Sequence, residues 1–264
     1  CNGGFQSGKD DQHGPINFLN ANMQLDSTVY SVSEDNQPWH SLTYELNYKW
    51  EIDSSGQELT ASADYSGFNS RTHQYLTSAF LNNEGETAAP TQYRRGQMPS
   101  DITIKVAKAD YVLPLKKSAK LGIGFKASFV TSDNNVQYDN SPDQINWAVD
   151  TTSTNHFIYK ENINAGYINF NKDFKKGWSL QAGLRGEQTV SNADQITSDS
   201  VVKRNYFQLF PSVFLRKNLN DNNSIGLSYS RRIDRPNYQD LNPFKYVIDQ
   251  YTLKQGNTDL KPQF

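Results

Sequence analysis

The residue types that most often carry chemistry are few and scattered in this sequence. The four histidines, His13, His40, His73 and His156, form neither an HxxxH nor an HxH pair, and Cys1 is the single cysteine. A tetrahedral zinc set therefore cannot be assembled from cysteine and histidine. The sequence also contains no nucleophile elbow and no phosphate-binding loop. We expect neither a cofactor nor an enzymatic activity.

Two acidic turns and the first residue have simpler interpretations. The DNN triplets at 133–135 and 221–223 lack the spaced ligands and closing glutamate of an EF-hand, and Asp and Asn are common in turns. Cys1 fits either the lipidated start of a mature lipoprotein or a fragment boundary. With a single cysteine, no disulfide can form within the chain.

Four aromatic side chains are candidates for ligand binding, because each lies in a segment that we expect to be a long loop. They are Tyr75, Tyr93, Trp147 and Tyr246. Aromatic side chains line many ligand sites and could stack against sugar rings.

A cluster of basic residues is a further candidate. Arg231, Arg232 and Arg235 could bind an anionic ligand, or they could brace carboxylates and backbone carbonyls. We favour the bracing role, because the guanidinium group presents donors in a fixed geometry and the nearby prolines Pro236 and Pro243 interrupt regular backbone pairing.

Composition limits the class of protein. The 264 residues carry 26 Lys and Arg against 28 Asp and Glu, which argues against a nucleic-acid binder. Hydrophobic content is only 36%, although there are 15 Tyr and 14 Phe. This balance suits a thin apolar band with aromatic rims. No apolar run approaches the 18 residues of a membrane-spanning helix, which a β-barrel does not need.

Period-2 alternation is the main structural signal. The apolar row from Leu42 to Ile52 and the row from Leu59 to Tyr65 flank a tight turn at Asp53–Gly56, which predicts a hairpin over 42–65. In the stretch 101–113 the apolar parity changes after Val106, which predicts a bulge. Further strands are expected at about 19–26, 121–129, 158–171, 178–190, 205–216 and 224–233.

The connections alternate between short and long along the chain. Short connections are expected at 53–56, 116–120, 172–177 and 217–223, and long polar loops at 69–100, 132–156, 191–204 and after 231. Alternate connections of an up-and-down meander lie at the same end. The sequence therefore predicts an all-β protein, an up-and-down antiparallel meander that is part of a transmembrane outer-membrane β-barrel.

The two faces of the expected strands have different environments. The even-numbered apolar residues from Leu42 to Ile52 are expected to face lipid. A wet or plugged lumen is expected around the charged residues Glu45, Lys49, Glu51, Asp64, Lys126, Arg185, Glu187 and Arg216. An antiparallel sheet with one solvated face would give the same alternation.

Residues 228–264 closely resemble a segment of the outer-membrane barrel of TonB-dependent receptors of the Bacteroidetes type. The matching pieces are SRRI at 230–233, RP at 235–236, YQDLNPF at 238–244, GN at 256–257 and LKP at 260–262. Supporting pieces occur at 109–115, 161–170, 181–189 and 209–215. The resemblance covers roughly residues 40–264. We expect 1–39 to form an N-terminal strand and a polar loop, and 40–264 a partial barrel that is truncated relative to the family.

The resemblance implies an importer of a large scarce nutrient, such as an iron chelate, a glycan or a peptide, in a Gram-negative outer membrane. It also implies outer-membrane lipid, the remaining barrel strands, a plug domain, the TonB complex and a surface lipoprotein as partners. We count about ten strands, whereas barrels of this class have about 22. The chain alone is therefore not expected to transport anything.

A second hypothesis belongs to a different class. The chain could be a soluble or surface-attached β-domain that binds carbohydrate through the loop aromatics. Exposure of Leu42, Tyr44, Leu46 and Tyr48 to lipid would distinguish the two.

Overall fold

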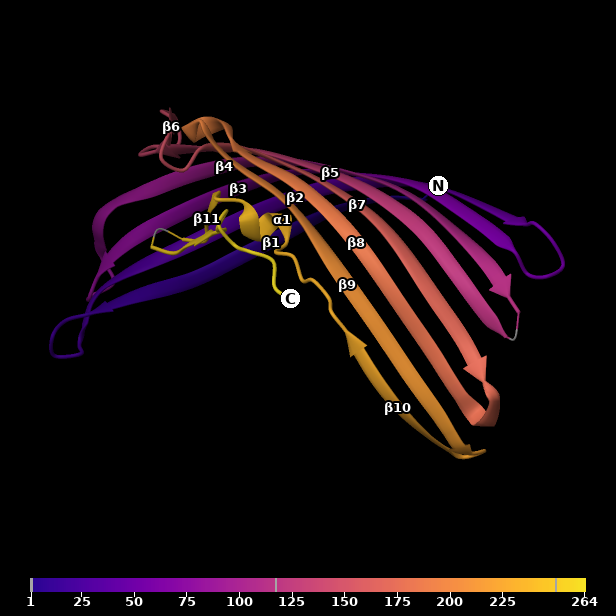
Figure 1. Cartoon of the computed structure of the whole chain (residues 1–264). Helices are drawn as coiled ribbons and strands as arrows, with labels where there is room; N and C mark the ends of the chain where they lie inside the picture. Colours follow the sequence, from indigo (N-terminus) through magenta and orange to yellow (C-terminus); the bar gives the residue numbers. More distant parts are fainter. Residues whose placement is uncertain (1, 117, 250) are drawn as a thin grey trace.

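The computed structural model describes residues 2–116, 118–249 and 251–264, so Cys1 and the question of its lipidation lie outside the described residues. The chain forms one long antiparallel sheet in the order β1-β2-β3-β4-β5-β7-β8-β9-β10, with the short β6 paired to β5. Figure 1 shows that the sheet is strongly curved. The strands are β1 (Asn2–Leu19), β2 (Leu25–Glu51), β3 (Glu58–Asn82), β4 (Thr87–Leu115), β5 (Ala119–Ser141), β6 (Ala148–Val149), β7 (Asn155–Phe174), β8 (Trp178–Gln195), β9 (Ser200–Asn220) and β10 (Asn223–Ser230).

The remaining elements are short. Two 3-10 turns, η1 (Lys175–Gly177) and η2 (Ile196–Ser198), connect β7 to β8 and β8 to β9. After β10 come the single helical turn α1 (Tyr238–Leu241) and the small hairpin of β11 (Lys245–Val247) and β12 (Leu253–Gln255). None of the described helices is long and apolar enough to cross a membrane.

The predicted meander and the predicted hairpin over 42–65 are both confirmed. Tyr44 pairs with Tyr65, and Trp50 pairs with Leu59 beside the turn. The Asp53 carboxylate accepts hydrogen bonds from the backbone and hydroxyl groups of Ser55. Gly56 has φ +92°, a conformation that favours glycine. The turn chemistry therefore sets the register of the hairpin.

The strands are much longer than predicted, and this corrects the expectation of long loops. Residues 69–100 are mainly strand, because β3 and β4 continue to a tight turn at 83–86. β5 likewise extends to Ser141 and β8 to Gln195. In these extensions both faces are largely polar, so hydropathy alternation is lost although the backbone ladder continues. Of the four connections predicted to be long, only 142–154 and the segment after β10 remain long, because 83–86 and 196–199 are tight turns.

Two other expectations meet a different structure. Residues 2–39 are mainly strand rather than polar loop, and positions 39 and 40 both lie inside β2. The bulge predicted after Val106 is absent: the register runs unbroken from Val106 opposite Asp64 to Ala107 opposite Ala63. The apolar residues of β4 change from even to odd positions because they change faces of the sheet. Ile102 is buried on the concave face, whereas the apolar residues beyond Val106 lie on the outward face.

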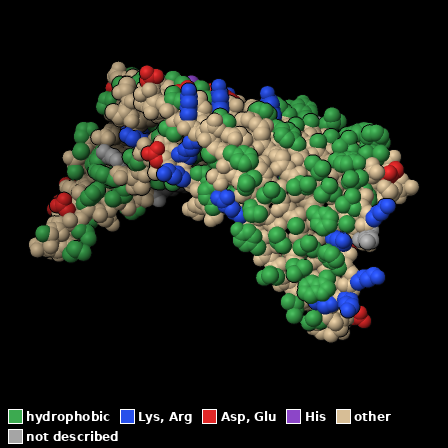
Figure 2. Space-filling model, in the orientation of Figure 1, with side chains coloured by type: hydrophobic (Ala, Val, Ile, Leu, Met, Phe, Trp, Pro, Cys, Tyr) green, Lys and Arg blue, Asp and Glu red, His purple; other side chains and the backbone are tan. Residues whose placement is uncertain are grey.

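The two faces of the sheet have the predicted characters. Leu46 is 71% exposed, and the other apolar residues of its row are also exposed on the outward face. Figure 2 shows hydrophobic side chains gathered over β8, β9 and β10 towards the short-turn end. Cross-strand pairs such as Glu45 with Asp64 lie on the opposite, concave face. The sheet is not closed, since β1 and β10 form its two edges.

Candidate functional site

The most distinctive site is made by the C-terminal segment, residues 231–264, on the concave side of the sheet. The segment leaves β10 and runs back across the sheet, as Figure 1 shows for α1 and β11. Its two ends meet where Asp234 and Gln263 exchange backbone hydrogen bonds of 2.9 and 2.8 Å. The long connection predicted after residue 231 is therefore a folded unit inside the curve of the sheet.

A close backbone contact holds the C-terminal segment together. The amide nitrogen of Gly256 donates to the carbonyl oxygen of Asn242 at 3.0 Å, and that of Asn257 donates to Asp240 O at 2.7 Å. A Cβ atom at position 256 would lie 2.6 Å from Asp240 O. Only glycine fits this approach. The YQDLNPF and GN pieces of the sequence are thus spatial neighbours.

Apolar contacts anchor the C-terminal segment to the wall at two places. Leu241 is buried against Phe157, Tyr159 and Ala193 of β7 and β8. Val247 is buried in a second cluster with Leu76, Met98, Val136 and Tyr138 of β3, β4 and β5, against which Phe244 and Tyr246 also pack. The ring of Phe244 stacks on that of Tyr138 with 6.2 Å between centroids. Burial of these side chains makes the segment part of the core.

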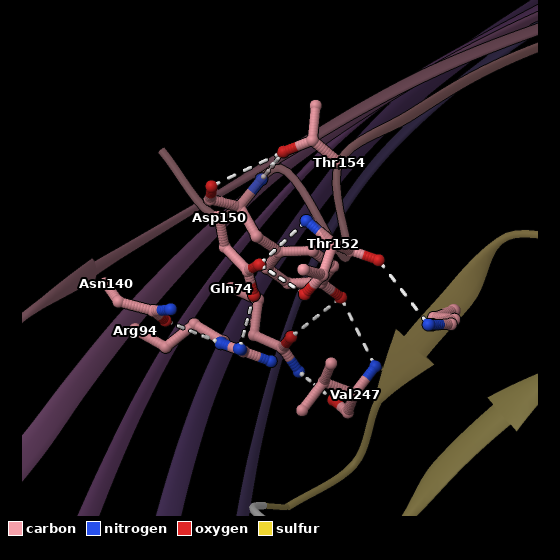
Figure 3. A network of polar contacts seen from close by, with 9 residues as sticks. Gln74, Arg94, Asn140, Asp150, Thr152, Thr154 and Val247 are labelled. Carbon is pink, nitrogen blue, oxygen red and sulfur yellow. Dashed lines mark hydrogen bonds and ion pairs between the residues drawn. The ribbon is translucent and has the colours of Figure 1, made fainter. Parts of the chain in front are cut away.

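A closed set of hydrogen bonds reinforces the second cluster (Figure 3). The Tyr138 hydroxyl donates to Gln74 Oε1 at 3.4 Å, and Gln74 Nε2 donates to Val247 O at 3.2 Å. Val247 N in turn donates to the Tyr138 hydroxyl oxygen at 3.3 Å. We call these three residues the latch. All three residues are buried, so their polar groups need partners within the protein, and Gln74 Nε2 also donates to Ser33 Oγ at 3.1 Å.

The connection between β5 and β7, residues 142–154, contacts residues beside the latch, as Figure 3 shows. Arg94 Nη2 donates to the Asp150 carboxylate at 2.6 Å, and Tyr138 N donates to Thr154 Oγ1 at 3.1 Å. Lys245 Nζ reaches Thr152 O at 3.5 Å. Burial alone would raise the pKa of Asp150, but hydrogen bonds from Thr152 and Ser153 and the charge of Arg94 hold that pKa below its ordinary value.

The three candidate arginines have different surroundings. Arg235 Nη2 lies 3.4 Å from Glu187 Oε1 and 3.1 Å from Thr189 Oγ1 of β8. Arg231 donates to Leu209 O at 3.0 Å. These contacts agree with the bracing role predicted for Arg231 and Arg235. Arg232 is exposed and makes no hydrogen bond or ion pair with another described residue, so the bracing role expected for it is wrong.

The four candidate aromatics do not form one site. Tyr75 and Trp147 lie together on the outward face, with ring centroids 6.0 Å apart, and Arg95 lies 4.5 Å over the Trp147 ring. Tyr93 belongs to the neighbouring outward row of β4. Tyr246 lies on the concave side, where its hydroxyl donates to the Asp35 carboxylate at 2.9 Å.

Sequence reasoning missed the latch and its supports. Tyr138, Arg94 and Asp150 lie in segments that the sequence predicts to be long loops, and no spacing between them indicates a contact. Gln74 in β3 and Val247 are 173 residues apart. Within the part of the chain that the structure describes, no group of three His, Cys, Asp or Glu residues is arranged to hold a metal ion.

The sequence matches the Outer membrane protein beta-barrel family over residues 50–264. The chain therefore belongs to this family, and the curved meander is part of an outer-membrane β-barrel in a Gram-negative bacterium. The concave face is the lumen side of the barrel wall, and the outward apolar face contacts lipid.

Other comparisons give low similarity. No curated protein matches the sequence. Similar solved structures include the ferric citrate transporter FecA in its unliganded form, with a TM-score of 0.39 and 9% identity over 83% of this chain and 42% of that chain. The ferric yersiniabactin uptake receptor FyuA from Yersinia pestis has a TM-score of 0.39 and 7% identity over 98% of this chain and 44% of that chain. The chain spans less than half the length of these two structures.

Proposed function

We propose that this chain is part of a TonB-dependent receptor of the Bacteroidetes type, which imports a large scarce nutrient without chemical conversion. The nutrient classes that we consider are an iron chelate, a glycan and a peptide. The observation that carries the proposal is the C-terminal segment on the lumen side, anchored through Leu241, Val247 and Arg235. A passive pore needs an open aqueous lumen, whereas a segment folded into it favours gated passage.

The remaining partners of the proposed receptor follow from the open sheet. β1 and β10 present unpaired edges, which hydrocarbon does not tolerate. Further strands of the polypeptide would close the wall, and barrels of about 22 strands have a lumen wide enough for a plug. We therefore propose that a plug domain, the TonB complex and a surface lipoprotein complete the system, and that the 264 residues alone transport nothing.

The second hypothesis, a soluble or surface-attached carbohydrate-binding domain, has less support. The exposed apolar row around Leu46 and membership of an outer-membrane barrel family both favour the membrane receptor. Tyr246, one of its four proposed sugar-binding aromatics, faces the lumen side and is separated from the other three by the sheet.

Energy-dependent uptake tests the proposal. Cells that express the full-length protein would be compared with a deletion strain for uptake of labelled maltohexaose, tri-galacturonate, ferric citrate and tetra-alanine. We expect saturable uptake of one class that stops when a protonophore collapses the proton gradient. Uptake that rises linearly with concentration and resists the protonophore would show a passive pore instead.

A further inference from the structure

A pocket of about 350 Å³ lies at the mouth of the lumen, where three distant parts of the chain meet. One part of the lining is Thr152, in the loop that follows β6, with Asn155 at the start of β7. Another part is Gln195 at the end of β8 with Ser200 at the start of β9. The C-terminal segment contributes Lys245 and Thr258. The volume lies in the usual range for a small-molecule site. The latch is a different group of side chains, against β3 and β5, and it adjoins the pocket where the backbone N–H of Tyr138 donates to Thr154 Oγ1.

The lining of the pocket is polar but almost uncharged. Of its 16 residues, eight carry hydroxyl groups, three carry side-chain amides and one, Lys245, is charged. Hydroxyl and amide groups both donate and accept hydrogen bonds, so they complement ligand hydroxyls in either direction. A multiply charged chelate would have only the Lys245 ammonium group to balance its negative charges. Burying the remaining charge would be costly, so the lining does not suit such a ligand.

One amide in the pocket wall has an unused acceptor. Gln195 Nε2 donates to Asn155 Oδ1 at 2.5 Å. Gln195 Oε1 is buried without a hydrogen-bond partner among the described residues. A buried acceptor that lacks a donor is uncommon in folded proteins. The oxygen is closed off from the pocket in this conformation, and a rotation of the Gln195 amide would present it to a ligand hydroxyl, which is a donor of the type that it requires.

We infer that this pocket binds a neutral, polyhydroxylated ligand, namely a unit of an oligosaccharide. The inference rests on the proposed function and narrows its three nutrient classes to glycans. The pocket is shared between the wall and the C-terminal segment, so a bound sugar contacts both. Ligand binding energy can then favour one position of the segment over another. The outward cluster of Tyr75 and Trp147 takes no part, because it lies on the other face of the sheet.

The test is direct binding to the full-length receptor purified in detergent. The probes are maltohexaose, xylohexaose and mannohexaose as neutral glycans, with tri-galacturonate, ferric citrate and tetra-alanine as competitors of other charge or class. Ser200→Trp fills the pocket from an exposed position, and Gln195→Leu removes the amide at similar volume. Asn83→Trp, at the exposed tip of the β3–β4 hairpin, is the matched control.

We expect one neutral oligosaccharide to bind, with at least a tenfold loss of affinity for Ser200→Trp and Gln195→Leu and a change within twofold for Asn83→Trp. Binding of ferric citrate or tetra-alanine without any neutral glycan would overturn the inference. So would a neutral glycan whose affinity is unchanged by both pocket variants.

Uptake separates this inference from the proposed function. Protonophore-sensitive uptake of ferric citrate or tetra-alanine, unaffected by Ser200→Trp, would leave the proposed function standing and overturn the glycan pocket. Glycan binding that Ser200→Trp abolishes, combined with protonophore-resistant uptake, would support the pocket and overturn gated transport.

Discussion

The backbone N–H of Val247 donates to the hydroxyl oxygen of Tyr138, which lies 109 residues earlier in the chain and is completely buried. Through Gln74 the same two residues are joined a second time, since Gln74 accepts from the Tyr138 hydroxyl and donates to Val247 O. These hydrogen bonds hold the C-terminal segment at one position along the barrel wall. Weakening them should make the segment easier to displace.

Tyr138→Phe should loosen the C-terminal segment without unfolding the wall. The change removes the hydroxyl from the latch but keeps the ring that stacks on Phe244. A buried hydrogen-bond partner left unmatched costs about 1–3 kcal/mol, so amide exchange at Val247 should accelerate about tenfold or more. Hydrogen exchange of the full-length receptor measures this. Tyr44→Phe on the lipid-facing side is the control, and equal exchange in both variants would contradict the latch.

Arg235→Ala and Arg232→Ala should differ in their effect on stability. Arg235 contacts Glu187, which is 5% exposed and is also paired with Arg185 at 3.0 Å. Loss of Arg235 removes one partner of a buried carboxylate and should destabilise the protein by about 1–3 kcal/mol. Arg232 is exposed, so its loss should change stability by less than about 0.5 kcal/mol. Heat-modifiability on gels compares the two, and equal shifts would contradict the assignment.

Leu46→Arg should impair assembly far more than Asn47→Arg. Leu46 lies on the outward face, where a charge near the bilayer midplane costs about 2–4 kcal/mol. Asn47 is on the lumen side, opposite Ser62. The fraction of heat-modifiable protein in the outer membrane measures assembly. Equal tolerance at the two positions would argue against lipid contact at Leu46.

Gly124→Ala should be destabilising, whereas Gly166→Ala should be tolerated. A Cβ atom at Gly124 would overlap the Tyr167 ring and lie 2.6 Å from Asp110 Oδ1. The Tyr167 hydroxyl donates to that carboxylate at 2.5 Å, so the substitution would break this cross-strand contact, and overpacking typically costs about 1–3 kcal/mol. No atom lies within 4 Å of a Cβ at Gly166. Thermal melting of both variants tests the difference; equal melting temperatures would rule out the crowding.

The tie between Asp150 and Arg94 should be insensitive to pH over the neutral range. Because the pKa of Asp150 is lowered on folding, its contribution is present above the ordinary aspartate value of about 3.9 and is lost as pH falls through the lower folded value. Amide exchange at 150–154, corrected for its intrinsic pH dependence, should therefore rise only below about pH 4. Asp150→Asn should remove that rise. Loosening between pH 5 and 7 would contradict this mechanism.

Local sequence was sufficient for the plan of the wall. The alternation from Leu42 to Ile52 determined which side chains face outward, because a strand places neighbouring residues on opposite faces. The turn at Asp53–Gly56 determined where the strand reverses. The succession of alternating strands, each next to the preceding one, agreed with the meander. Each of these features depends on residues close together in sequence.

Only the tertiary structure decided where strands end and what lies in the lumen. The extensions of β3 and β4 could not be recognised from hydropathy, since their backbone ladder persists although polar residues predominate on both faces, where apolar residues such as Leu76 and Met98 are too few for regular alternation. The separation of Tyr246 from Tyr75 and Trp147 depends on the C-terminal segment turning inward. The meeting of Tyr138, Gln74 and Val247 depends on the register of several strands and on sheet curvature. These are long-range properties, and local periodicity does not encode them.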